Sequence, residues 1–250
     1  MNAGSAVKAA ASAINDGSNG VLSAPQSGRW LNQSEPGRGF AIEIKSGKLF
    51  FGGFLYDAAG NSTWNVSGPA PMQSTTDYSG TLDVYAGGPT LNGAFKSAAL
   101  TGSQGPLTIK FTGPGTGVLT WAGGAIPIKR FEFSPGGLST VKTTFAPENG
   151  WRLDPAEPGR GYAIEVQGNQ LFAAGFMYDD SGKPVWHLTS GLLTSLYDNI
   201  GNWVHYSGGQ ALGGAFRPAC ITNPNIGAVR MQFTSTAAAN LTLPKGIHCT

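Results

Sequence analysis

The sequence predicts an all-β protein made of two tandem antiparallel β-barrels of about eight strands each, with β-sandwiches as the alternative. Three observations support this fold class. Residues 35–64 return as residues 157–186 without a gap, and 16 of the 30 positions are identical. Glycine accounts for 38 of the 250 residues, whereas charged residues make up only 12% of the chain. Short stretches of alternating apolar and polar residues between glycine-rich turns are typical of β-hairpins.

The repeat divides the chain into two units. Residues 85–96 match 206–217, and 107–111 match 229–233. Each unit therefore has about 110 residues, a usual length for a domain and too long for a solenoid repeat. The predicted organisation is a flexible leader over 1–27, a first β-barrel domain over 28–133, a linker over 134–149 and a second β-barrel domain over 150–250.

The strands of the first unit follow from local patterns. Residues 40–45 alternate apolar and polar side chains, and Ser46-Gly47 supplies a tight turn before a strand over 49–56. A glycine-containing turn then leads to a third strand that carries Trp64, because glycine permits positive φ. Further strands are predicted near 79–85, 91–96, 106–112, 117–121 and 126–133. The second unit repeats the first three strands.

The ends of the first unit suggest that its sheet closes. Gly28-Arg29-Trp30 opens the unit, and Lys129-Arg130 lies in its last predicted strand. A tryptophan near the first strand beneath a cation from the last strand resembles the closing motif of lipocalin- and avidin-like barrels. The second copy has Gly150-Trp151-Arg152 instead. Closure also removes the strand edges that invite aggregation, which favours a barrel over a sandwich.

The repeated Glu-Pro-Gly-Arg-Gly segment is the first candidate for a functional role. Arg38 and Arg160 share strand parity with apolar residues that face a core, and a buried arginine must be paired. The glutamate three residues earlier is the expected bidentate partner. We interpret the segment mainly as a structural turn, with a ligand-anchoring arginine as the alternative. The turn residues are Glu35, Gly37, Gly39, Glu157, Gly159 and Gly161.

Aromatic residues recur at equivalent positions of the two units. Tyr56 and Trp64 correspond to Tyr178 and Trp186. Aromatic residues at such a spacing usually belong to a core, but in a barrel wide enough for a small molecule they also line a cavity. The predicted ligand-binding residues are therefore Arg38, Tyr56, Trp64, Arg160, Tyr178 and Trp186.

The sequence shows no catalytic constellation. Nucleophile and phosphate-binding motifs are absent. Each unit has two candidate carboxylates, Glu35 with Glu43 and Glu157 with Glu165. Glu43 and Glu165 lie on the opposite strand face from the arginines, so neither pair is expected to converge as in a glycosidase. The three histidines, His187, His205 and His248, lack zinc-site spacing and are only weak metal candidates. We predict no catalytic residue, no metal and no cofactor.

Charge and cysteine content indicate the compartment and exclude some partners. The net charge is +2 and the basic residues are scattered, which argues against nucleic-acid binding. No apolar run approaches the ~18 residues of a transmembrane helix. An even cysteine count and low charge favour a Cys220–Cys249 disulfide in an exported protein. This bond would hold a shortened closing strand in the second unit.

Segment 151–162 resembles a known bacterial domain. It reads WRLDPAEPGRGY and is followed by GNQLF at 168–172. The resemblance is to exported bacterial proteins with the pattern W-x-N-P-x-E-x-G-R-G-[FY], then G-N-x-L-F and Y-D-x-x-G-x-P-x-W. It covers nearly all of both units, although the first copy has Asn32-Gln33-Ser34 without the proline. The resemblance implies export and repetition and assigns no activity.

These observations together lead us to expect an exported, non-catalytic binding protein at a periplasmic, cell-surface or extracellular location. The leading hypothesis is a module that recognises a glycan, a surface polymer or a partner protein, because two linked weak sites gain avidity. The alternative is a lipocalin-like carrier of a small apolar molecule, and a hydrolase is the third hypothesis. An open aromatic-lined cavity would favour the carrier, whereas a flat exposed aromatic strip would favour the module.

Overall fold

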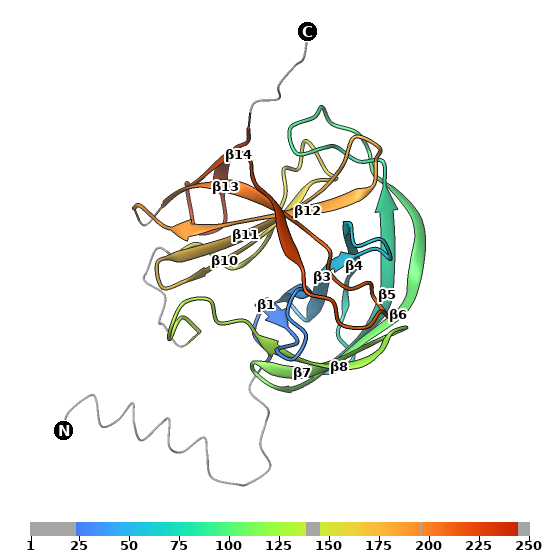
Figure 1. The fold of residues 1–250 in the computed structure, drawn as a ribbon. Coiled ribbons are helices and arrows are strands. Elements are labelled where there is room, and N and C mark those ends of the chain that lie inside the picture. Colours follow the sequence, from blue (N-terminus) through green and yellow to red (C-terminus); the bar gives the residue numbers. More distant parts are fainter. Residues whose placement is uncertain (1–23, 139–145, 196, 245–250) are drawn as a thin grey trace, which may run out of the picture.

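The computed structural model describes residues 24–138, 146–195 and 197–244, which fold into two β units side by side (Figure 1). Most of the predicted leader, residues 1–23, lies outside the described residues. The described chain contains β-strands and no α-helix. Every pair of neighbouring strands in the two sheets is antiparallel, as predicted. Strands that follow one another in the chain pair as hairpins, for example residues 39–45 with 48–54.

The first unit is a closed barrel in which consecutive strands pair and the last returns to the first. Its eight strands are β1 (Gly28–Leu31), β2 (Gly39–Lys45), β3 (Lys48–Tyr56), β4 (Ser62–Pro71), β5 (Asp77–Ala86), β6 (Ala99–Gly113), β7 (Thr116–Trp121) and β8 (Gly124–Arg130). At the closure, Trp30 on β1 lies opposite Arg130 on β8. The Arg130 guanidinium lies over the Trp30 ring, 6.0 Å from its centroid. Closure of the first barrel was therefore predicted correctly.

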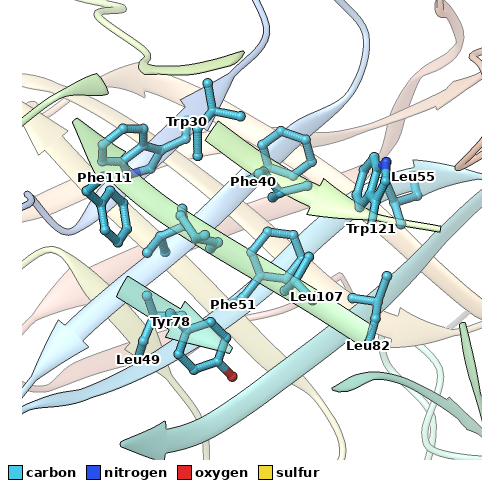
Figure 2. Packing of buried hydrophobic residues seen from close by; sticks show 14 residues of the cluster. Trp30, Phe40, Leu49, Phe51, Leu55, Tyr78, Leu82, Leu107, Phe111 and Trp121 are labelled. Atoms are coloured by element: carbon cyan, nitrogen blue, oxygen red, sulfur yellow. The ribbon is translucent and has the colours of Figure 1, made fainter. Parts of the chain in front are cut away.

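Side chains fill the interior of the first barrel (Figure 2). The ring centroids of Phe40 and Phe51 lie 5.6 Å apart, and Trp121 meets Phe40 edge-on at the same distance. An eight-stranded barrel is just wide enough for such filling. The cluster consists of Trp30, Phe40, Ile42, Leu49, Phe51, Leu55, Tyr78, Leu82, Leu107, Ile109, Phe111, Leu119, Trp121 and Ile128. The first barrel is thus a packed core and not an internal ligand chamber.

Among the described residues, the second unit is an open seven-stranded sheet and not the closed barrel that the sequence predicted; residues 245–250, where a shortened closing strand was expected, lie outside the described residues. Its strands are β9 (Gly150–Arg152), β10 (Gly161–Gln167), β11 (Gln170–Tyr178), β12 (Pro184–Leu192), β13 (Asp198–Ser207), β14 (Cys220–Phe233) and β15 (Ala239–Thr242). No strand among the described residues joins β15 to β9, as β8 joins β7 to β1 in the first unit. A groove of 620 Å³ therefore borders these two strands, lined by apolar residues such as Tyr162, Met231 and Leu241.

The prediction of a strand over 91–96 was wrong. These residues belong to an irregular loop, 87–98, that connects β5 to β6, and 208–219 is its counterpart between β13 and β14. We call these two segments the exchange loops, because each crosses to the other unit. Leu91 packs into the core of the second unit, and Leu212 packs against the core of the first. The loops therefore lock the two units together.

Candidate functional site

The two units share a third apolar cluster, and it contains the repeated aromatic residues. Tyr56, Trp64, Tyr178 and Trp186 are all at most 5% exposed. The Trp64 indole N–H donates to the Met177 carbonyl over 2.9 Å, and the Trp186 indole N–H donates to the Leu55 carbonyl over 3.0 Å. The two bonds are equivalent in the repeat: Trp64 corresponds to Trp186 and Leu55 to Met177, each 122 residues apart. A pseudo-two-fold axis therefore relates the units, as in an isologous dimer.

Arg38 and Arg160 anchor the exchange loops. Arg38 forms an ion pair with Glu35, and its Nη1 donates to the carbonyl of Leu212 over 3.0 Å. Arg160 forms the equivalent ion pair with Glu157, and its Nη1 donates to the carbonyl of Leu91 over 3.1 Å. Each ion pair is a single Nη2–Oε2 contact and not the bidentate pair that the sequence suggested. The Glu-Pro-Gly-Arg-Gly turn therefore holds the neighbouring unit as well as its own.

A buried ionic cluster crosses the interface, and the sequence reasoning did not find it. Glu165 is 1% exposed and accepts hydrogen bonds from Arg130 Nη2 over 2.5 Å and from the Arg29 backbone N–H over 2.6 Å. Arg130 Nη1 also donates to the Arg29 carbonyl over 3.2 Å. Glu165 is thus the carboxylate bonded to two buried arginines, to Arg130 through its guanidinium and to Arg29 through its backbone N–H. This cluster carries an excess positive charge.

Arg29 lies between two aromatic rings. Its guanidinium carbon is 4.9 Å from the Phe54 centroid and 4.8 Å from the Phe172 centroid. Burial lowers the pKa of Arg29 to about 9, which the Glu165 carboxylate opposes and the Arg130 charge reinforces. Arg29 therefore remains protonated at neutral pH. Its Nη2 donates to the Ala163 carbonyl, whereas its buried Nη1 has no hydrogen-bond partner.

A cavity of 250 Å³ lies beside this cluster, between the two units. It is the place where the structure gathers Arg38, Tyr56 and Trp186 from the predicted ligand-binding set. Trp64, Arg160 and Tyr178 are not among its lining residues. Much of its wall is aromatic, with Phe54, Phe131, Phe172 and Tyr206 next to Trp186.

Three lining side chains of the cavity carry a buried polar atom without a hydrogen-bond partner among the described residues. These atoms are Arg29 Nη1, Arg38 Nε and the Tyr56 hydroxyl. Burial lowers the pKa of Arg38, and the Glu35 carboxylate opposes this shift. Burial also raises the pKa of Tyr56, so its hydroxyl stays protonated and able to donate. Buried polar groups without partners are uncommon in folded proteins, and three of the nine such atoms among the described residues line this one cavity, which makes it the candidate binding site.

The pseudo-symmetric place in the other half of the interface is different. Trp151 occupies the position equivalent to Arg29, and its ring lies 4.7 Å from Phe176 and 4.8 Å from Phe50. These two phenylalanines correspond to the pair that encloses Arg29. The two sides therefore differ in charge: one holds the Arg29 guanidinium and the other the neutral Trp151 indole, and each has a buried N–H without a hydrogen-bond partner among the described residues.

The histidines and cysteines lie elsewhere. His187 and His205 meet in the second unit with their Nδ1 atoms 3.3 Å apart. Burial, and then the charge of His205, lower the pKa of His187 to about 3. His248 and Cys249 lie outside the described residues. Cys220 begins β14 with an exposed thiol and no disulfide in the described chain, so the disulfide with Cys249 stays a prediction.

No protein-family model, curated protein or solved structure matches this chain. The candidate site therefore rests on its own geometry. Among the residues that the structure describes, no helix has the length and apolar character needed to cross a membrane.

Proposed function

We propose that the protein is a non-catalytic binding protein whose cavity between the units takes a small organic anion with an apolar ring. The observation that carries this proposal is the set of three buried donors without partners, Arg29 Nη1, Arg38 Nε and the Tyr56 hydroxyl. Donors of this kind suit a carboxylate or a similar anionic group, because charge-assisted hydrogen bonds are the strongest that side chains form.

The charge balance of the cavity supports an anionic ligand. Arg38 has its own counter-ion in Glu35. Arg29 and Arg130, in contrast, share only Glu165, which leaves one buried positive charge without compensation. An uncompensated buried charge is unfavourable, so a ligand with one negative charge would restore the balance. The expected ligand is therefore a monoanion.

The size and walls of the cavity define the rest of the ligand. Its 250 Å³ is just below the usual range of roughly 300–1,000 Å³ for small-molecule sites. Such a volume suits one ring with its anionic substituent. An acidic sugar at the end of a glycan and an aromatic carboxylate share this chemistry, because both place a flat face against aromatic side chains and a carboxylate near arginine. The acidic sugar would fit a glycan-binding module, the leading hypothesis from the sequence, and the aromatic carboxylate would fit a carrier of small molecules.

Calorimetric titration with benzoate and with glucuronate separates the two sources. We expect saturable binding of one probe to the full chain. The variant Tyr56→Phe should weaken that binding about tenfold, because it removes one hydrogen bond to a charged group, worth roughly 1.5–3 kcal/mol. Tyr178→Phe is the matched control at the pseudo-symmetric position, and we expect it to leave the affinity unchanged. The proposal fails if neither probe binds, or if both variants weaken binding equally.

We also propose export and the Cys220–Cys249 disulfide. The resemblance to exported bacterial domains, the low charge and the exposed Cys220 thiol support both. Mass measurement of the purified protein under non-reducing conditions tests the bond: a mass two hydrogens below that of the reduced chain is expected, and two free thiols would contradict it.

A further inference from the structure

Two histidines face each other inside the second unit, apart from the cavity between the units. His187 comes from β12 and His205 from the adjacent strand β13, and their Nδ1 atoms are 3.3 Å apart. The ring centroids are separated by 5.2 Å, and the ring planes cross at 64°. The equivalent positions of the first unit hold Asn65 and Val84. The fold itself therefore does not require imidazole at either position.

We propose that His187 and His205 form a binding site for a first-row transition-metal ion such as Zn²⁺ or Cu²⁺, with both Nδ1 atoms as ligands. A tetrahedral zinc ion holds imidazole nitrogens at roughly 2.0–2.1 Å, which places two such nitrogens about 3.3–3.4 Å from each other. The observed 3.3 Å separation already meets this requirement. To bind an ion, the rings must turn so that both Nδ1 lone pairs point at the ion and no longer along the line between the two nitrogens.

The ion would replace a hydrogen bond. At 3.3 Å, one Nδ1–H donates to the lone pair of the other Nδ1. When the donor ring moves its proton to Nε2, both Nδ1 lone pairs become free and both rings remain neutral. Neutral imidazole is the form that binds metals, through either nitrogen. No proton or electron is gained or lost in this exchange.

The surroundings define an open site with two protein ligands. His187 is 8% exposed, and His205 is partly exposed on the solvent side of the pair. The described residues contain no group of three or more His, Cys, Asp or Glu side chains that could surround an ion. Water or an added ligand would complete the coordination, as it does at the open position of catalytic zinc sites. We therefore expect reversible, micromolar binding.

Titration of the chelator-treated full chain with Cu²⁺, followed by electron paramagnetic resonance, tests the site. The expected result is one saturable ion per chain with hyperfine coupling to two nitrogens. His187→Asn introduces the residue that the first unit carries, and it should weaken binding by more than about tenfold and remove one nitrogen coupling. His205→Gln should have the same effect, which keeps the test valid if one variant does not fold. His248→Gln is the control and should bind as the original protein does.

Zn²⁺ gives an independent readout by ¹⁵N nuclear magnetic resonance of the imidazole rings. Without metal, one ring should be the Nδ1–H tautomer, and with Zn²⁺ both rings should become Nε2–H tautomers. The proposal is overturned if no saturable binding occurs, if His187→Asn binds as tightly as the original protein, or if His248→Gln alone abolishes binding.

Discussion

Replacing Glu165 by glutamine tests the buried ionic cluster between the units. The carboxylate accepts hydrogen bonds from Arg130 Nη2 over 2.5 Å, from the Arg29 backbone N–H over 2.6 Å and from Gln167 Nε2 over 2.9 Å. Glutamine preserves the shape of the side chain but removes its charge. Arg29 and Arg130 then remain buried together without a counter-ion. Breaking a buried pair in this way costs about 3–5 kcal/mol, a large part of the roughly 5–15 kcal/mol that stabilises a typical native protein.

Glu43 provides a matched control for this experiment because it is the pseudo-symmetric equivalent of Glu165. It is half-exposed, and it accepts one long hydrogen bond, 3.4 Å, from the Trp151 backbone N–H. Glu43→Gln should therefore change the free energy of unfolding by less than about 1 kcal/mol. Equilibrium unfolding in urea measures both variants of the full chain. Equal destabilisation by the two substitutions would refute the account of a buried, charge-dependent interface.

Four further variants probe the same interface. Arg38→Ala should lower the melting temperature by several degrees, because it breaks the Glu35 ion pair and releases an exchange loop; an unchanged melting temperature would contradict this role. Trp64→Phe and Trp186→Phe should each lower the free energy of unfolding by at least about 1 kcal/mol, since each removes one hydrogen bond between the units and leaves a cavity in the shared cluster; urea unfolding that shows only one of them to matter would argue against the pseudo-symmetry. Tyr56→Phe should raise the stability of the ligand-free protein by up to about 1 kcal/mol, because its hydroxyl is buried without a partner; a lower melting temperature would show that the hydroxyl is satisfied.

Local patterns predicted the hairpins of the first unit well. The turn at Ser46-Gly47 has both residues at positive φ, 51° and 72°, as a tight hairpin requires. Residues 91–96 were misassigned as a strand because they form a short stretch with apolar residues that recurs in the repeat. Leu91 is buried in the other unit, and a local pattern carries no information about such a distant partner. A shortened closing strand of the second sheet was expected at its C-terminal end, in residues that lie outside the described segment 197–244, and the described sheet is open.

The location of the aromatic residues was harder to predict than their burial. Strand β3 carries apolar residues on both faces: Phe51 and Leu55 fill the first barrel, whereas Phe54 and Tyr56 face the other unit. A strand with two apolar faces signals burial on both sides, and this signal was present in the sequence. The identity of the covering surface was not, because it depends on how the two units dock. The role of Glu165 in the ionic cluster was missed for the same reason, because its partners Arg29 and Arg130 lie in the other unit.

The pseudo-two-fold interface has a consequence for how such a protein can diversify. In a dimer of identical chains, any substitution on the axis-related surface occurs twice, so a binding feature and its structural replacement cannot coexist. The duplicated chain is free of this constraint, and positions 29 and 151 show it: one half has the cationic Arg29 between two phenylalanines, and the other has the neutral Trp151 between the equivalent pair. Tandem fusion thus lets the two sides of a symmetric contact carry different chemistry.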